Sequence, residues 1–421
     1  MGDRTYYEAT AEPLPDFPAL EGSVRADVCV IGAGFTGIGA ALSLVEGGYS
    51  VVVLEQGRVA CGASGRNGGQ IHTGLRKDQI YLERAFGTAA ARQLWDIGQD
   101  AVAEIDNRIV RHDIHAERVH GLIYADHRAG LADKTSRYVD HLRTHYAYDK
   151  VERLDSAGIR ALVKSDDYKG GMIDRGGGHL HPLKYARGLA RAAESAGAQF
   201  FENTKALSIT PGAKARVTTR SGEVMADWVL VAGDSLMQGL VPDADARIMP
   251  IASTIGVTAP LGERLKQYLT TPMAVADSRF VVNYFRPTAD GRLLFGGGES
   301  YSTTYVADPA AKVRRALRTV FPDLAETGFD FAWSGVVGVT ATRLPMVRRL
   351  YPNVLMAAGY SGQGVALAPF AGKVMAEAIM GTAEKFDILA RLPVPTFPGG
   401  AALRQPLLVL AMLWYALRDR L

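Results

Sequence analysis

The stretch Asp27-Val-Cys-Val-Ile-Gly-Ala-Gly-Phe-Thr-Gly37 decides the fold of this chain. Residues 28–31 form a short, continuous apolar run, which is typical of a strand covered on both faces of a parallel sheet. A small-residue helix over 38–46 and a second apolar run over 51–54 follow the glycine turn. The order of strand, glycine turn, helix and strand predicts a βαβ unit.

The glycine turn has the spacing Gly32-x-Gly34-x-x-Gly37, which is the pattern of a dinucleotide site. Gly32 permits the tight turn, Gly34 lets a pyrophosphate approach the backbone, and Gly37 lets the helix pack closely on the strand. The start of the helix offers unpaired N–H groups and the positive end of its dipole to the phosphates. Glu55 ends the second strand, where its carboxylate can accept both ribose hydroxyls. We therefore predict a dinucleotide site; the alternative is a glycine turn in an ordinary βαβ unit.

A second glycine-rich segment, Cys61-Gly-Ala-Ser-Gly-Arg-Asn-Gly-Gly-Gln70, follows soon after Glu55. Ser64, Asn67 and four glycines give it a polar, sterically open backbone, which suits a close passage over a planar ring or a phosphate. On its own such a segment could be a mobile loop. Because it directly follows the acid at Glu55, we interpret it as the second wall of a cofactor cleft.

The composition is that of a globular protein and excludes several functional classes. The 421 residues can form two or three domains, and 48% are hydrophobic and 22% charged. A net charge of +3 is too small to argue for a nucleic-acid partner. Two cysteines suggest neither a disulfide framework nor a metal site. Residues 1–20 are acidic and proline-rich without an apolar core, so we expect no signal peptide and a cytoplasmic protein.

The middle of the chain alternates helical and β signals. Helical periodicity predicts helices over 80–111 and 131–146, and a third helix begins at Pro182. Residues 249–331 are rich in β signals, and the turn at 287–291 predicts an antiparallel hairpin that suits a substrate-binding sheet. Further along the chain the pattern predicts a strand over 353–358, the turn Gly359-Tyr-Ser-Gly-Gln-Gly364 and a helix over 365–380. This order predicts a second strand–turn–helix anion site.

Two histidines could suggest a metal site. His179 and His181 are two residues apart, so they would point to the same side of a strand. No further ligand is spaced nearby, so a polar lining near the cleft or a plain surface is favoured over a metal site. The turn at 359–364 is similar to the G-x-S-x-G elbow of hydrolases, but Gln363 occupies the position of the second glycine, which argues against a hydrolase.

Together these segments resemble the D-amino-acid-oxidase-like family of FAD-dependent amine oxidoreductases. The resemblance extends over the whole chain and also rests on Gly177-Gly-His-Leu-His-Pro182, Arg292-Leu-Leu-Phe-Gly-Gly-Gly298, Phe397-Pro-Gly-Gly400 and Leu417-Arg-Asp-Arg-Leu421. It implies an α/β fold in which a Rossmann-like FAD-binding domain, a parallel sheet with helices, is interleaved with an α+β substrate-binding domain built on an antiparallel sheet. The expected boundaries are 24–110, 170–245 and 332–400 for the FAD-binding domain, 111–169 and 246–331 for the substrate-binding domain, 1–23 for an N-terminal arm and 401–421 for a C-terminal apolar helix.

The resemblance also implies which residues bind FAD. The pyrophosphate would lie on the first glycine turn, the adenosine ribose on Glu55, the adenine near the backbone of Ala206, and the flavin between the second glycine-rich segment and the last turn. The full expected set is Gly32, Gly34, Phe35, Thr36, Gly37, Glu55, Gln56, Ser64, Gly65, Arg66, Asn67, Gly68, Gly69, Gln70, Ala206, Gly233, Gly335, Gly359, Tyr360, Ser361, Gly362, Gln363 and Gly364.

At three positions this chain departs from the family pattern, which affects how far the family's residue roles apply to it. Sarcosine-oxidase-like relatives attach FAD through a cysteine near the position of Ser334-Gly335-Val336, but this chain has no cysteine after Cys61, so we expect noncovalent FAD. Those relatives also carry a lysine just inside the final helix, where this chain has Val365-Ala366, so the helix dipole must stabilise the reduced flavin. Gln363 occupies a position at which similar proteins carry histidine.

The chemistry implied by the resemblance is amine oxidation. A neutral amine would transfer a hydride to flavin N5, the imine would hydrolyse to an aldehyde, and O2 would reoxidise the flavin and give hydrogen peroxide. A gamma-glutamyl amine such as gamma-glutamylputrescine is the expected substrate, and its carboxylate would need an arginine. We expect Arg286, which shares a strand face with Tyr284, to position the substrate, with Arg76 and Arg343 as further candidates. The alternative for each arginine is a plain surface position.

Two other functions stay open on the sequence alone. A dehydrogenase of the same fold would oxidise a D-amino acid or an N-methyl amino acid and pass electrons to a quinone. A non-catalytic flavoprotein subunit would bind FAD without turning over a substrate. The apolar run 406–417 is too short to span a bilayer, so we expect a docked helix, with weak peripheral membrane contact as the alternative.

Overall fold

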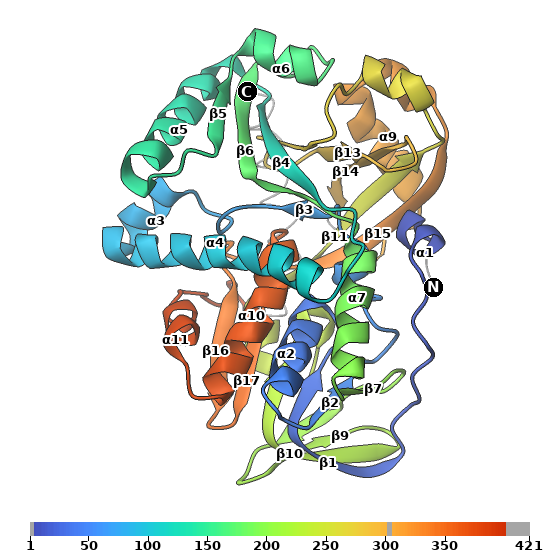
Figure 1. The fold of residues 1–421 in the computed structure, drawn as a ribbon, viewed down its shortest axis with the longest axis vertical. Coiled ribbons are helices and arrows are strands. Elements are labelled where there is room, and N and C mark those ends of the chain that lie inside the picture. The colour runs from blue at the N-terminus through green and yellow to red at the C-terminus, as the bar shows by residue number, and fades with distance from the viewer. Residues whose placement is uncertain (1–3, 301–304, 401–421) are drawn as a thin grey trace.

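The computed structural model describes residues 4–300 and 305–400, which form two large sheets with helices around them (Figure 1). The predicted C-terminal apolar helix at 401–421 and the chain end at 417–421 lie outside the described residues. No helix within these described ranges is both long and apolar enough to cross a membrane.

The first sheet has the parallel core that the βαβ pattern predicts. Its strand order is β16 (Met346–Tyr351), β17 (Val354–Ala358), β10 (Gly222–Val231), β1 (Gly22–Ile31), β2 (Val51–Leu54) and β7 (Gln199–Phe201). The pairs from β17 to β7 are parallel, and β16 is antiparallel at one edge. An antiparallel extension, β9 (Ala215–Thr218) and β8 (Ser208–Thr210), pairs with β10. The carboxyl ends of the parallel strands therefore meet at one edge of the sheet.

Strand β1 is longer than the apolar run predicts. The sequence predicts a strand over 28–31, whereas β1 begins at Gly22 because residues 22–26 pair in parallel with 222–226 of β10. This half of the strand is half-exposed and carries no continuous apolar run. The pairing partner, rather than local hydrophobicity, therefore sets where the strand begins.

The second sheet is mainly antiparallel, as expected for the substrate side. Its order is β15 (Phe329–Thr340), β11 (Ile248–Thr258), β14 (Leu293–Ser300), β13 (Tyr284–Pro287), β12 (Ala274–Asp277), β4 (Val119–Asp126), β6 (Gly170–His179) and β3 (Gln70–Ile71), with β5 (Val151–Leu154) paired to β6. The predicted hairpin is confirmed, because β13 and β14 pair antiparallel across the turn at 287–291. One pair, β12 with β4, is parallel, so the sheet is mixed.

The predicted domain boundaries stay a prediction, and three strands do not follow them. The ranges 24–110, 170–245 and 332–400 assign β3, β6 and most of β15 to the FAD-binding domain. All three strands hydrogen-bond in the second sheet. A glycine-rich strand such as β6 carries little information about which sheet it joins, because its few side chains do not distinguish a partner.

The helices cover the sheets and fill the space between them (Figure 1). Their bounds are α1 (Tyr6–Thr10), α2 (Phe35–Glu46), α3 (Gln79–Phe86), α4 (Thr88–Arg111), α5 (Ala132–Tyr146), α6 (Ser156–Leu162), α7 (Pro182–Ser195), α8 (Pro242–Asp245), α9 (Pro309–Val320), α10 (Gly364–Ile379) and α11 (Glu384–Ala390). The single helix predicted over 80–111 is wrong in one respect, because the chain breaks into α3 and α4 at Gly87, whose φ is +83°.

The helices of the two glycine turns, α2 and α10, pack directly against each other (Figure 1). Glycine makes this approach possible. A Cβ on Gly39 would lie 2.4 Å from the carbonyl oxygen of Pro369, and a Cβ on Gly372 would lie 2.0 Å from that of Thr36. The close crossing brings the N-terminal ends of both helices to the same edge of the first sheet.

Candidate functional site

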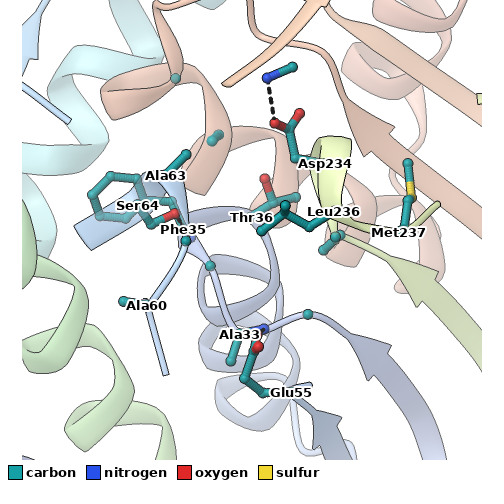
Figure 2. Close-up of a pocket in the computed structure, with 18 of the residues that line it drawn as sticks. Ala33, Phe35, Thr36, Glu55, Ala60, Ala63, Ser64, Asp234, Leu236 and Met237 are labelled. Atoms are coloured by element: carbon teal, nitrogen blue, oxygen red, sulfur yellow. Dashed lines mark hydrogen bonds between the residues drawn. The ribbon is translucent and has the colours of Figure 1, made fainter. Parts of the chain in front are cut away.

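A cavity lies at the carboxyl ends of the parallel strands, where the two glycine turns meet (Figure 2). It encloses about 1220 Å³ of empty space, part of it open to solvent. Such an edge of an open α/β sheet is where ligands bind in this class of fold. The predicted cofactor residues that line it are Gly32, Gly34, Phe35, Thr36, Glu55, Gln56, Ser64, Asn67, Ala206, Gly233, Tyr360, Ser361, Gly362 and Gly364.

The remaining predicted cofactor residues lie outside the lining of this cavity. They are Gly37, Gly65, Arg66, Gly68, Gly69, Gln70, Gly335, Gly359 and Gln363. Gly37 and Gly359 determine the backbone conformation of the two turns and do not contribute to the cavity surface. A Cβ on Gly37 would lie 1.8 Å from the carbonyl oxygen of Gly32, and Gly359 has a φ of +75°.

Glu55 is held at the end of β2 by the backbone around it. Its carboxylate accepts hydrogen bonds from the N–H groups of Ala33 and Gly57, both at 2.8 Å. Burial raises the pKa of this carboxyl, and the backbone hydrogen bonds act in the opposite direction. A carboxylate has about four acceptor positions, so it can still accept hydroxyl groups from a ligand in the cavity.

Ser64 connects the second glycine-rich segment to the start of helix α2. Gly34 is the N-cap of this helix and has no side chain to cap it. The hydroxyl oxygen of Ser64 instead accepts a hydrogen bond from the N–H of Phe35 at 2.8 Å. The first turn of a helix leaves further N–H groups without intrahelical partners, and Thr36 in that turn lines the cavity. Phosphate groups are suitable acceptors for them.

The last glycine turn is built on three residues with positive φ, namely Gly359 (+75°), Ser361 (+54°) and Gly362 (+87°). Asp234, which follows β10 and lines the cavity (Figure 2), holds this turn in place. Its carboxylate accepts hydrogen bonds from the N–H of Gly359 at 2.7 Å and from the N–H of Gly338 at 2.9 Å. The expected cofactor set includes the neighbouring Gly233 but not Asp234.

The cavity fits a dinucleotide that carries a flavin. Its lining includes the carboxylate of Glu55, the start of helix α2 and the turn before α10. A Cβ on Gly362 would meet nothing within 4 Å, so the turn is open on this side. The Oε1 atom of Gln363 is buried and has no hydrogen-bond partner within the described residues. The open side of the turn at Gly362 suits an edge of the flavin as a neighbour.

The predicted substrate residues, Tyr284 and Arg286, lie on β13 and both contact Gly68. A Cβ on Gly68 would lie 2.6 Å from the ring of Tyr284, and Nε of Arg286 donates to the carbonyl oxygen of Gly68 at 3.0 Å. Arg286 is only 2% exposed and lines a second cavity of about 910 Å³ together with His179. The further candidate Arg343 lies over the ring of Phe280. Neither Arg76 nor Arg343 lines the first or the second cavity.

The two histidines of interest have separate structural partners. Nε2 of His179 donates to the carbonyl oxygen of Pro272 at 2.9 Å, and Nδ1 of His181 accepts from the N–H of Lys184 at 3.1 Å, which caps helix α7. Burial lowers the pKa of each ring to about 3. Across the described ranges, no group of three or more His, Cys, Asp or Glu side chains is placed to hold a metal ion.

Comparisons with known proteins agree with this geometry. The family model described as "FAD dependent oxidoreductase" (DAO) matches residues 27–378. A probable oxidoreductase, OrdL, of Rhizobium meliloti (strain 1021) is 40% identical over 417 residues, covering 99% of this chain and 97% of the relative. The gamma-glutamylputrescine oxidoreductase of Escherichia coli (strain K12) is 38% identical over 420 residues, covering 99% and 98%.

Solved structures share the fold at lower sequence identity. The L-proline dehydrogenase of P. horikoshii has a TM-score of 0.73 at 18% identity and covers 89% of this chain and 98% of its own. The glycine oxidase of Geobacillus kaustophilus has a TM-score of 0.71 at 20% identity and covers 85% and 95%. The family match and the full-length relatives show that this chain belongs to the DAO family, the FAD-dependent oxidoreductases that act on the C–N bonds of amines and amino acids.

Proposed function

We propose that the protein is an FAD-dependent oxidase of amines whose substrate is a gamma-glutamyl amine such as gamma-glutamylputrescine. The observation that carries this proposal is the 38% identity, over 99% of this chain, to the gamma-glutamylputrescine oxidoreductase of Escherichia coli (strain K12). The cytoplasmic location and a role in polyamine catabolism stay predictions.

The residues around the first cavity would hold FAD in one orientation. The N–H groups at the start of α2 would bind the pyrophosphate, Glu55 would accept the ribose hydroxyls, and the backbone at Ala206 would contact the adenine. The start of α10 would lie at the pyrimidine edge of the flavin, where the positive end of its dipole stabilises negative charge. FAD supplies the capacity to accept a hydride from the carbon beside the substrate nitrogen.

The two cysteines support noncovalent attachment of FAD. Cys29 is buried in β1, within the first sheet. Cys61 lines the cavity, but its sulfur lies 3.9 Å from Oε1 of Glu55, at the end where the adenosine would bind. Neither thiol is therefore placed beside the last glycine turn, where the flavin ring is expected. The substrate-positioning roles of Tyr284 and Arg286 stay predictions.

An anaerobic reduction screen tests the proposed function. Purified holoenzyme is mixed without oxygen with gamma-glutamylputrescine, putrescine, N-methyl amino acids or D-amino acids, and the flavin absorbance is followed. We expect gamma-glutamylputrescine to bleach the flavin, whereas putrescine, which lacks the glutamyl carboxylate, serves as the matched control. Air should then restore the colour and yield about one hydrogen peroxide for each flavin, because two electrons pass to O2.

Other outcomes of the same screen would overturn the proposal in different ways. Reduced flavin that stays bleached in air but reoxidises with a quinone would identify a dehydrogenase. If only D-amino acids or N-methyl amino acids bleach the flavin, the substrate belongs to that class and not to the gamma-glutamyl amines. Flavin that no amine of the panel bleaches would favour a non-catalytic flavoprotein subunit.

A further inference from the structure

Four consecutive carbonyl oxygens in the second glycine-rich segment, at residues 66–69, each accept a hydrogen bond from a different part of the chain. We refer to this segment as loop 66–69. The four donors are Nε1 of Trp333 on β15 to Arg66 (3.1 Å), the hydroxyl of Tyr7 on α1 to Asn67 (2.8 Å), Nε of Arg286 on β13 to Gly68 (3.0 Å) and the N–H of Leu180 after β6 to Gly69 (2.9 Å). Three of these donors are side chains, and they come from sites far apart in the sequence.

The three side-chain donors form one cluster. Tyr7 is fully buried, and its ring meets the ring of Trp333 edge-on with centroids 5.3 Å apart. Nη2 of Arg286 donates to the hydroxyl oxygen of Tyr7 at 3.3 Å, and that hydroxyl donates onward to loop 66–69. Within the described ranges Arg286 forms no ion pair with a carboxylate. Its charge therefore polarises the hydroxyl of Tyr7 and strengthens the hydrogen bond that this hydroxyl donates.

Loop 66–69 contributes one residue to the lining of the cofactor cavity. Asn67 lines the cavity, and its side-chain amide nitrogen donates to the carbonyl oxygens of Ala63 and Ser64 at 3.0 and 2.9 Å. Ser64 in turn accepts from the N–H of Phe35 at the start of α2. A displacement of the loop would therefore move both the cavity wall and the partner of the α2 N-terminus.

We propose that Tyr7 is a positioning residue for the FAD site, which makes the N-terminal helix α1 part of the cofactor-binding structure. Its hydroxyl, together with Trp333 and Arg286, holds loop 66–69 by the carbonyl oxygens and so fixes the wall of the cavity. The inference rests on the assignment of the first cavity to FAD but not on the identity of the substrate or the electron acceptor.

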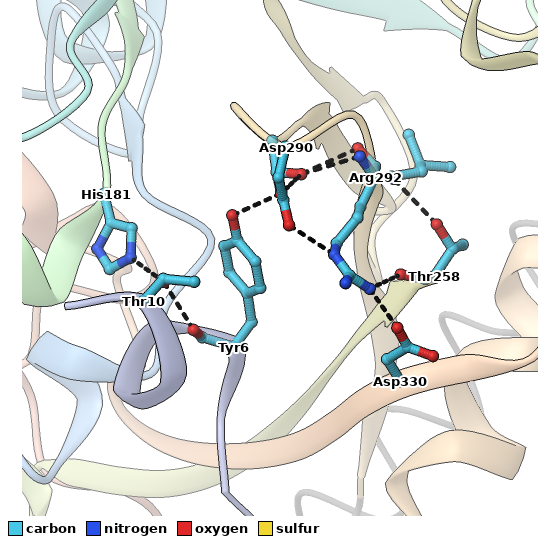
Figure 3. Close-up of polar contacts among 9 residues, drawn as sticks. Tyr6, Thr10, His181, Thr258, Asp290, Arg292 and Asp330 are labelled. Carbon is cyan, nitrogen blue, oxygen red and sulfur yellow. Dashed lines mark hydrogen bonds and ion pairs between the residues drawn. The ribbon is translucent and has the colours of Figure 1, made fainter. Parts of the chain in front are cut away.

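The preceding residue, Tyr6, provides a matched control. Tyr6 is also buried on α1, but its hydroxyl donates to Oδ1 of Asp290 at 2.8 Å, in the turn between β13 and β14 (Figure 3). Asp290 also accepts from Nε of Arg292 at 2.7 Å. The hydroxyl of Tyr6 thus holds α1 on the hairpin and does not contact loop 66–69.

The test compares full-length Tyr7→Phe and Tyr6→Phe holoenzymes. Each holoenzyme is dialysed to equilibrium, and the free FAD is measured by its fluorescence. The melting temperature of each protein is also recorded. Loss of one hydrogen bond corresponds to about five- to tenfold weaker binding, so we expect this increase in the FAD Kd for Tyr7→Phe and a change below about twofold for Tyr6→Phe. Equal FAD Kd values for the two variants, even with a lowered melting temperature, would overturn the proposal.

A second variant keeps the proposal testable if Tyr7→Phe does not fold. Trp333→Phe retains an aromatic ring but removes the N–H that donates to Arg66. We expect it to weaken FAD binding about as much as Tyr7→Phe and to shift the visible spectrum of the bound flavin. A Trp333→Phe protein with unchanged FAD Kd and spectrum would show that loop 66–69 does not depend on these donors. These readouts need no substrate, so a wrong assignment of the amine would leave them unaffected.

Discussion

The hydroxyl groups of Thr36 and Tyr360 lie 2.7 Å apart, although 324 positions separate the two residues in the sequence. Thr36 belongs to the first turn of α2, and Tyr360 lies in the turn before α10. Both side chains line the first cavity and are nearly fully buried. One hydrogen bond therefore joins the two glycine turns that would hold opposite parts of FAD.

Removing this hydrogen bond should weaken FAD binding and lower the stability of the protein without abolishing FAD binding. Tyr360→Phe keeps the ring and deletes the hydroxyl, so Thr36 loses its partner. We expect the free energy of unfolding to fall by about 1 kcal/mol and the FAD Kd to rise severalfold. Thermal unfolding and FAD dialysis measure the two effects. Tyr351→Phe is the control, because Tyr351 is 47% exposed on β16; equal effects in both variants would contradict the prediction.

The close packing at Gly37 predicts that this position tolerates no side chain. A Cβ there would lie 1.8 Å from the carbonyl oxygen of Gly32, so the backbone of the turn itself would have to move. We expect Gly37→Ala to cost about 1–3 kcal/mol of stability or more, as overpacking does, and to yield protein with little bound FAD. The flavin-to-protein absorbance ratio measures the occupancy. Gly328→Ala, where a Cβ meets nothing within 4 Å, should retain full occupancy.

The hydrogen bonds of Asp234 predict that its negative charge stabilises the last glycine turn. Its two carboxylate oxygens accept from Gly359 and Gly338, and in Asp234→Asn one of them becomes an NH2 group that faces an N–H donor. Hydrogen bonds to a charged group contribute about 1.5–3 kcal/mol, so the FAD Kd should rise by about tenfold or more. Exposed Asp323→Asn is the control. A wild-type FAD Kd in Asp234→Asn would show that the turn holds its shape without the carboxylate.

The sequence predicts the parts of this fold that local patterns determine. The glycine spacing at 32–37 and the apolar runs at 28–31 and 51–54 correctly predict the βαβ unit, because Gly37 packs on Gly32 and the two strands pair within the same unit. The turn at 287–291 predicts its hairpin for the same reason. These contacts join residues that are close in the sequence, so periodicity and turn chemistry carry the information.

The rest depends on partners that are distant in the sequence. Nothing near Tyr7 indicates that its hydroxyl reaches Asn67, and nothing near Trp333 indicates that its N–H reaches Arg66. The sheet that β6 joins is set by pairing with β4, which a glycine-rich strand does not specify by its side chains. Asp234 was not predicted as a site residue because its role arises only when β15 and the last turn come together.

His181 makes two hydrogen bonds, and one of them, at Nδ1, requires a neutral ring. Nδ1 accepts from the N–H of Lys184, so the proton is on Nε2, which lies 3.0 Å from the hydroxyl of Thr10 on α1 (Figure 3). Burial is the main cause that lowers the pKa of His181 from 6.5 to about 3, and the positive charge of Arg286 adds to it. A proton on Nδ1 would remove the cap of α7.

This arrangement predicts that acid destabilises the protein through His181. Between pH 6.5 and about 3 the unfolded chain binds a proton at this residue and the folded protein does not. Protons therefore favour unfolding in this window, with a slope of up to about 1.4 kcal/mol per pH unit for one site. Asn caps helices and does not titrate, so His181→Asn should give a shallower loss of unfolding free energy in urea titrations from pH 6.5 to 4. His115→Asn is the control, because that side chain is 91% exposed. A wild-type slope in His181→Asn would show that other groups carry the acid sensitivity.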